Sequence, residues 1–519
     1  MATIRIDFNN FISQSTEFKE KVLLGIIVIF MIIMSINIMS YGFNYPIIDM
    51  FGFRQAQTAI TSYWLVEEGY KIDYITPILG PPWSIPFEFP VYQYIVSCLH
   101  EISGLGLDQS GRVINILFFY TSASMTFFLL RALRFSTIQA LVPVLLFLGS
   151  PFYLFWSRSF MIESTALAFG LGSILFLIKS IKEEKVSYLC LATVLGCLSS
   201  LTKITTFGIC LAFMSLVFLT LLYDKYKGRN GISYFKLFLF ALIATILPIV
   251  IAVSWNYHAD FLKSQNSLAT FIMSGNLSSW NFGTIEKKLA LKTWLAVLSR
   301  GELIVGSIGF VAIGFISLLS KKAFLLSVAA LVSFLIGPAV FTNLYVVHEY
   351  YFYANGLFLL LFISGGVIAL LKCRHFIASG AVMILILFTM QYKYYDTYPK
   401  WIKHSPHSSY VKTGLAINKL TKESDVVIIY GSDWDSSIPY YSKRKVIMDR
   451  AMGTLDRKEI KKSLEEIGHQ NIGAVVLCDY RKTIAYDDVF RQSRVEHFDL
   501  NVEPVRAGKC DIYHRNINE

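Results

Sequence analysis

Eight ionisable residues lie at or near the ends of apolar segments, in five separate parts of the chain. They are Asp49, Arg54, Glu88, Arg158, Glu163, Lys203, His348 and Glu349. A carboxylate takes the proton of an attacking hydroxyl or amine, and arginine and lysine bind phosphate oxygens. Charges beside lipid cost free energy and are retained where they face a cavity, a partner or a reaction. The set therefore indicates a reaction between a lipid-borne phosphate and a polar acceptor.

The composition predicts the scaffold that holds these residues. Hydrophobic residues make up 54% of the chain and charged residues 16%, against roughly 25% charged in a soluble domain. Runs close to the ~20 residues that cross the hydrocarbon predict a polytopic α-helical membrane protein. The expected spans are 22–40, 113–130, 137–156, 163–178, 187–202, 205–222, 237–254, 302–320, 323–341, 354–371 and 375–391.

The distribution of lysine and arginine predicts how these spans are oriented. With the N-terminus inside, basic residues are concentrated in the inner segments and are sparser in the longer outer loops, as the positive-inside rule requires. This placement accounts for the net charge of +11 without a nucleic-acid partner. We expect a multi-pass protein of the bacterial inner membrane, with the segment after residue 391 in the periplasm.

The chain is predicted to have two domains. Residues 1–391 form the membrane domain, with a first outer loop at 41–112 whose residues 41–90 are expected to be non-helical. Residues 392–519 are more charged and alternate short strand patterns with an amphipathic helix, which is typical of a small α/β domain with a mostly parallel sheet. The strand patterns cover 425–431, 445–449 and 473–478, and the helix covers 456–468.

Two further features of the outer segments stay open at this stage. Residues 255–300 mix aromatic and polar residues, which favours interfacial helices lying on the bilayer. Cys478 and Cys510 fall on separate predicted strands, where a disulfide is compatible with the sequence but not required by the spacing.

Five short motifs, in order, carry a resemblance to a known family. They are IIDMFGFRQAQTAI from residue 47, PFEFPVYQY from 86, SRSFMIESTAL from 157, LSSLTKIT from 198 and VVHEYYFY from 346. This order resembles glycosyltransferases of the GT-C fold, in particular the dolichyl-phosphate-mannose-protein mannosyltransferases and the lipid A aminoarabinose transferases. The phrase GSDWDSSIPYYSKRK at 431–445 resembles the soluble domain of some bacterial members.

The resemblance implies roles for individual residues. Asp49 is the expected general base. Many members have an acidic pair at this point, but Met50 follows Asp49 here, so one carboxylate must suffice. Glu88 matches an acidic residue that shapes the acceptor or metal region. Arg158 and Glu163 match the R-x-x-x-x-E pattern that enters the fourth span in the family, and either contact with substrate or a structural role is compatible with it. The residues expected to face the polyprenyl phosphate are Arg54, Arg158, Lys203, His348, Tyr350 and Tyr351, with Glu349 in the acceptor region or structural.

Each of these residues also has a plainer interpretation. Asp49 would suit the cap of a helix, and Arg54 would suit contact with lipid headgroups. Arg158 and Glu163 would suit an ion pair at a helix start. His348 would bind a divalent metal together with Glu88 or Glu349 only if several donors converge. Asp433 and Asp435 are assigned to a structural loop of the outer domain.

The predicted reaction moves a monosaccharide from a polyprenyl-phosphate carrier to a glycan such as lipopolysaccharide, a lipid or a protein, by one inverting displacement. No cofactor is required, although a divalent metal near Glu88 and His348 remains compatible with the sequence. The alternatives are a lipid-linked glycan transporter, which would carry polar or Gly/Pro breaks at mid-membrane, and an O-antigen polymerase or ligase, which would rely on outer arginines without Asp49.

Overall fold

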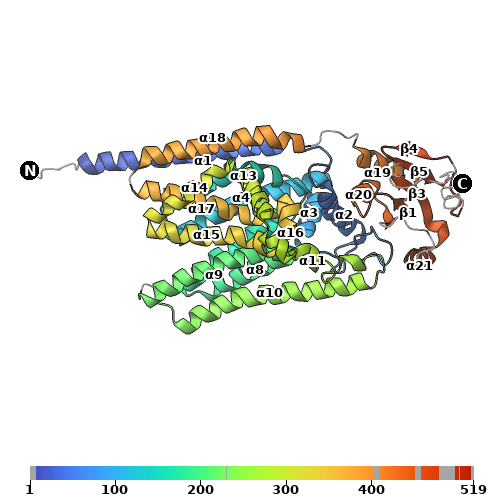
Figure 1. Cartoon of the computed structure of the whole chain (residues 1–519), viewed down its shortest axis with the longest axis horizontal. Helices are drawn as coiled ribbons and strands as arrows, with labels where there is room; N and C mark the ends of the chain where they lie inside the picture. Colours follow the sequence, from blue (N-terminus) through green and yellow to red (C-terminus); the bar gives the residue numbers. More distant parts are fainter. Residues whose placement is uncertain are drawn as a thin grey trace, which may run out of the picture.

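The computed structural model describes residues 8–228, 231–373, 375–402, 408–449, 458–478, 497–501 and 503–515. Long helices run side by side along one axis, and a small domain built around a sheet lies at one end of them (Figure 1). The predicted fold class, a polytopic helical membrane domain with a small C-terminal α/β domain, is confirmed.

Eight helices of the described chain are long and apolar enough to cross a membrane. They are α1 (Phe8–Ser40, apolar over Val22–Ser40), α4 (Leu107–Ala132), α7 (Glu163–Glu183), α9 (Ile204–Tyr226), α10 (Tyr234–Ser264), α15 (Lys321–Val340), α17 (Phe352–Lys372) and α18 (Phe376–Thr397). Shorter apolar helices at α5 (Thr137–Gly149) and α8 (Val186–Thr202) match two more predicted spans.

The predicted span 302–320 is broken. α13 (Leu291–Val305) is followed by Ile308–Leu319, which contains η2 (Ile308–Phe310), α14 (Val311–Gly314) and η3 (Phe315–Leu319), at an angle of 89°. Gly306, at the break, has a φ of +84°, and a Cβ there would lie 2.9 Å from the backbone of α18. Only glycine combines this conformation with so close an approach.

The first outer loop contains helices, so the expectation of a non-helical stretch at 41–90 is wrong for residues 52–68 and holds for the irregular residues 69–90. α2 (Gly52–Glu68) and α3 (Val91–Ser103) flank an irregular segment, and α4 already begins at Leu107. Gln55, Ala56, Ala59 and Ile60 are buried on α2. The sequence shows no helical periodicity in this segment because α2 is buried on most of its faces and therefore has no single apolar stripe.

The segment 255–300 also differs from the prediction. Its first ten residues continue α10 as far as Ser264, and Trp255 is buried against the outer loop. Short helices follow at η1 (Thr270–Ile272), α11 (Ser278–Phe282) and α12 (Ile285–Leu289). The expectation of interfacial helices is therefore wrong for residues 255–264, because they continue α10 and pack on residues of the outer loop.

The small domain has a five-stranded sheet in the order β2-β1-β3-β5-β4. β1 (Val426–Tyr430), β2 (Lys445–Asp449) and β3 (Ile472–Cys478) are parallel, as predicted, while β4 (Val505–Ala507) and β5 (Cys510–His514) are antiparallel. Its helices are α19 (Ser409–Leu420), α20 (Ser437–Ser442) and α21 (Lys458–Ile467), the last at the predicted helix, whose residues 456 and 457 lie outside the described chain. Cys478 and Cys510 face each other across β3 and β5 and form a disulfide.

The small domain and the first outer loop share one hydrophobic core. Loop residues add to the sheet edge: Val446 N–H donates to the Pro77 carbonyl at 3.0 Å and Met448 N–H donates to the Ile78 carbonyl at 3.0 Å. The Trp434 ring packs on Phe53 of α2 and Phe87 of the loop. Apolar burial and backbone pairing therefore hold the loop from the outer side.

Candidate active site

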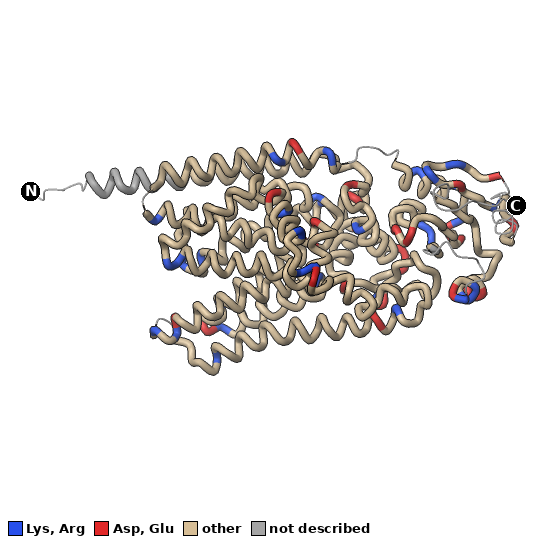
Figure 2. The backbone as a smooth tube through the Cα atoms, in the orientation of Figure 1, with Lys and Arg blue, Asp and Glu red and all other residues tan. Residues whose placement is uncertain are grey.

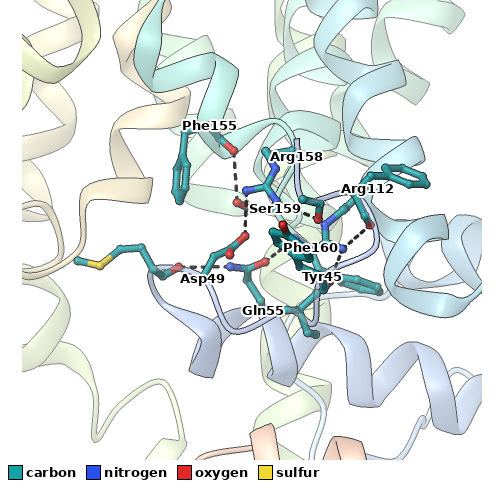
Figure 3. Close-up of polar contacts among 12 residues, drawn as sticks. Tyr45, Asp49, Gln55, Arg112, Phe155, Arg158, Ser159 and Phe160 are labelled. Carbon is teal, nitrogen blue, oxygen red and sulfur yellow. Dashed lines mark hydrogen bonds and ion pairs between the residues drawn. The ribbon is translucent and has the colours of Figure 1, made fainter. Parts of the chain in front are cut away.

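Asp49 and Arg158 form the most deeply buried ion pair of the site. Arg158 NH1 lies 3.0 Å from Asp49 Oδ2, and both side chains are 0% exposed. Figure 3 shows the two side chains pointing toward each other between the turn before α2 and the turn before α7. A second Arg158 nitrogen donates to the Gly42 carbonyl at 3.3 Å. The pair joins two outer turns that are more than a hundred residues apart in the chain.

The turn that carries Asp49 is held by groups that the sequence prediction missed. Arg112, fully buried on α4, donates to the carbonyls of Phe43 at 2.7 Å and Tyr45 at 2.6 Å. Gln55 donates to the Met50 carbonyl at 3.2 Å and accepts the Phe160 N–H at 2.9 Å (Figure 3). The one sequence signal for this role was the position of Arg112 at the start of an apolar segment, because an arginine that is buried there requires hydrogen-bond partners.

Asp49 does not cap α2. The residue before the helix is Phe51, which has a left-handed backbone with a φ of 56°, and no side chain caps the helix there. The Asp49 backbone carbonyl accepts the Gly52 N–H at 2.9 Å while its carboxylate turns to Arg158. The capping interpretation is therefore wrong.

A second group of charges consists of one partly exposed ion pair and one buried ion pair. Arg54 of α2 forms an ion pair with Glu88, and their side chains are 14% and 26% exposed. Lys203, in the turn between α8 and α9, forms an ion pair with Glu163 in the first turn of α7. An ion pair between Arg158 and Glu163 is thus wrong, since each has a different partner. The helix dipole favours the Glu163 carboxylate at this N-terminus.

Aromatic rings line this second group. The Lys203 ammonium lies 4.1 Å from the ring centroid of Tyr351 and 5.2 Å from that of Tyr350. The Tyr350 and Tyr351 rings stack with centroids 5.0 Å apart. Phe51 packs edge-on against Tyr350 and His348, at 5.2 and 5.3 Å. Both tyrosines come from η4 (Glu349–Tyr351), which follows α16 (Thr342–Val347).

His348 lies among these rings and beside positive charge. Burial, followed by the nearby Lys203 and Arg54 charges, lowers the pKa of His348 from 6.5 to about 4. The imidazole is therefore neutral at neutral pH.

Glu349 is directed elsewhere. Its carboxylate is buried and lies 2.7 Å from Arg300 NH2 of α13. Glu88 and Glu349 are thus each bound to a different arginine. Within the described ranges, no three His, Cys, Asp or Glu side chains converge as metal ligands. The Asp435 carboxylate accepts the Ser437 N–H at 2.8 Å at the start of α20, a structural contact within the outer domain.

Comparison with known proteins decides the fold family. A family model described as dolichyl-phosphate-mannose-protein mannosyltransferase matches residues 84–255, about a third of the chain. No curated protein sequence matches. Among solved structures, ArnT from Cupriavidus metallidurans bound to undecaprenyl phosphate superposes with a TM-score of 0.57 at 12% identity, over 94% of this chain and 97% of that one.

Two other structures agree. The oligosaccharyltransferase of Archaeoglobus fulgidus has a TM-score of 0.54 at 12% identity, over 88% of this chain and 70% of that one. The mycobacterial arabinofuranosyltransferase AftD has a TM-score of 0.51 at 12% identity, over 89% of this chain and 39% of that one.

The chain has the GT-C fold. The match to ArnT extends over both the membrane helices and the small outer domain, since it covers nearly the whole of each chain. Within this GT-C fold, the two groups of charges described above lie on the outer loop and the adjacent helix ends.

Proposed function

We propose that the protein is a membrane glycosyltransferase that moves a monosaccharide from a polyprenyl-phosphate carrier to an acceptor on the outer side of the membrane. The observation that carries the proposal is the second group of charges, in which Arg54 and Lys203 come from distant segments, each is paired with a carboxylate, and Lys203 lies against the Tyr350–Tyr351 pair. The matched GT-C neighbour that is bound to undecaprenyl phosphate supports the choice of carrier.

Arg54, Lys203 and the Tyr350–Tyr351 pair are the proposed donor-phosphate site. In the structure each cation is paired with a carboxylate, Glu88 or Glu163. A phosphate that enters between them exchanges these contacts for charge-assisted hydrogen bonds to its own oxygens. Arg158 was also predicted to contact the phosphate, but it is buried in its ion pair with Asp49. In our proposal Arg54 and Lys203 bind the phosphate without it.

The proposed reaction breaks the bond between the sugar anomeric carbon and the phosphate oxygen and forms a bond from the acceptor oxygen to that carbon. The electron pair leaves with the lipid phosphate, whose growing negative charge Arg54 and Lys203 stabilise. Asp49 takes the acceptor proton as the general base. Arg158 acts as a positioning residue, because it fixes the direction of the Asp49 carboxylate.

Glu88 has a different proposed role. It is part-exposed, lies between Phe87 and Phe89 and bonds Arg54. Aromatic faces suit sugar rings, so we assign Glu88 to orienting the sugar or the acceptor and to holding Arg54 until donor binds. The acceptor class is a lipopolysaccharide or other glycan, a lipid or a protein hydroxyl. The positive-inside distribution supports a bacterial inner-membrane protein with this face in the periplasm.

The rival functions make different demands on the same residues. A lipid-glycan transporter would not need a base, and an O-antigen polymerase or ligase would work through outer arginines without Asp49. The burial of Asp49 against Arg158, rather than on a solvated surface, favours a role that requires a fixed carboxylate orientation.

The test is transfer of labelled sugar from a polyprenyl-phosphate-sugar pool in membranes, with wild type and Asp49→Asn at equal expression. We expect transfer by wild type and a loss of at least about 100-fold with the amide, the lower end of what general-base catalysis supplies. Asp73→Asn is the matched control, because Asp73 lies in the same loop and is half-exposed beside His258.

Equal activity of Asp49→Asn and wild type would remove Asp49 from the chemistry and point to Glu88. Transport of the lipid-linked sugar without transfer by wild type would replace the enzyme with the transporter.

A further inference from the structure

A second polar site lies at the other end of the membrane bundle. A cavity of about 500 Å³ opens between the turn joining α4 to α5, the C-terminal ends of α7 and α9, and the start of α15. Lys and Arg mark the turns at this end, away from the small domain (Figure 2). No part of the proposed transfer site lines it.

The cavity is strongly basic. Among the described residues that line it, Arg134, Lys182, Lys321 and Lys322 are cationic and Asp224 is the one carboxylate. Lys182 and Lys322 come from different helices and donate to the Ala132 and Arg134 carbonyls, so their ammonium groups are held at the cavity. The charge complementarity selects an anionic occupant.

The remaining wall of the cavity is apolar. Phe213, Leu216 and Val217 of α9 and Leu325 and Ala329 of α15 line it. Leu325 is 51% exposed and lies on a membrane-spanning helix, so this wall continues onto the surface that faces lipid. A free phosphate ion would use only the cations, whereas a phospholipid would use both walls.

Positive charge at this end is also what membrane insertion requires. That requirement is met by any lysine or arginine in the inner turns. It does not require four cations from three separate segments to line one cavity beside an apolar wall.

We propose that this cavity binds the headgroup of an anionic phospholipid from the inner leaflet, with the phosphate among the four cations and an acyl chain along α9 and α15. Basic pockets between membrane helices on the cytoplasmic side are suited to such headgroups. The site is independent of the proposed transfer site and would hold lipid whether or not the transferase assignment is right.

The test is lipid binding to the purified full-length protein by native mass spectrometry, with dioleoyl-phosphatidylglycerol and dioleoyl-phosphatidylcholine as probes. We expect selective binding of phosphatidylglycerol, weakened about 30-fold in a Lys321→Gln/Lys322→Gln variant. A Lys225→Gln/Lys227→Gln variant is the matched control: it removes two lysines at the same end that do not line the cavity, and should bind as wild type does.

A Thr220→Phe variant tests the cavity without changing charge, because Thr220 lines it and a phenyl ring would fill it. We expect Thr220→Phe to lose binding of phosphatidylglycerol although all four cations are in place. This variant keeps the proposal testable if the lysine variant does not fold. Equal binding of the two lipids, equal losses in both lysine variants, retention by Thr220→Phe, or displacement of lipid by glycerol 3-phosphate alone would each overturn the proposal.

Discussion

The Asp49–Arg158 and Arg54–Glu88 pairs both join an arginine to a carboxylate, and each has at least one member in the first outer loop, but they differ in burial. The first is 0% exposed on both sides, whereas the second is 14% and 26% exposed. A buried pair is costly to break because the remaining charge is left without solvent, while a partly exposed pair is screened by water and exchanges partners more easily. Burial thus separates a pair suited to holding geometry from a pair suited to meeting a ligand.

The largest expected effect is on the buried pair. Arg158→Met leaves the Asp49 carboxylate buried without its cation, which should cost about 3–5 kcal/mol of stability. Arg54→Met should cost about 1 kcal/mol or less, because Glu88 remains accessible to water. Thermal unfolding of the purified proteins in one detergent measures both. Equal losses would contradict the distinction between the pairs.

The Asp49→Asn/Arg158→Met double variant sharpens this result. Removing both charges should restore part of the stability lost in Arg158→Met, since no unpaired charge stays buried. A double variant whose loss of stability equals or exceeds the sum of the two single losses would show that the two residues do not act as a pair.

Arg112 should have the next largest effect. Arg112→Met leaves the carbonyls of Phe43 and Tyr45 without their donor, which should cost about 3 kcal/mol, the range of hydrogen bonds to charged groups. Because this turn carries Asp49, activity should fall together with stability. Arg131→Met on the same helix, at an exposed position, is the control. Unchanged unfolding of Arg112→Met would argue against this positioning role.

Lys203 should affect transfer as well as stability, because Lys203→Gln also leaves the buried Glu163 carboxylate without its cation. Lys203→Gln removes one proposed phosphate contact and should lower turnover about 100-fold, as for loss of one charge-stabilising donor. Lys71→Gln, an exposed lysine of the outer loop, should leave activity unchanged. Initial rates of sugar transfer at saturating and limiting donor separate binding from turnover. Normal rates in Lys203→Gln would exclude it from the phosphate site.

The smallest effect concerns His348 and pH. Because the pKa of His348 is lowered to about 4 from 6.5, the folded protein holds it neutral where the unfolded chain is protonated. Its contribution to stability is therefore present above pH 6.5 and is lost as the pH falls toward 4. His348→Gln should lose less stability than wild type over this window, measured by unfolding at stepwise pH. An unchanged pH profile would show that the imidazole is not buried beside cations.

Much of the fold could be predicted because its signals are local. Apolar length predicts the spans, and strand and helix alternation predicts the parallel strands β1, β2 and β3. The helical outer loop and the break at Gly306 were missed, since burial on all sides of α2 and the approach of α18 to Gly306 depend on distant segments.

The candidate residues show the same division. Position at span ends was enough to select Asp49, Glu88, Arg158, Glu163 and Lys203, but not to pair them. Arg158 and Glu163 are five residues apart, yet each pairs across the fold with a residue at least forty positions away. Arg112, whose partners are backbone carbonyls, carried almost no sequence signal.

The sequence by itself determined that this chain enters a membrane, that the ionisable groups of its apolar spans lie toward the span ends, and which residue types are available there. These follow from the cost of placing charge in hydrocarbon, which acts on every segment separately. Only the tertiary structure decided which charges are buried together, because ion pairing depends on distances between segments that packing brings into contact.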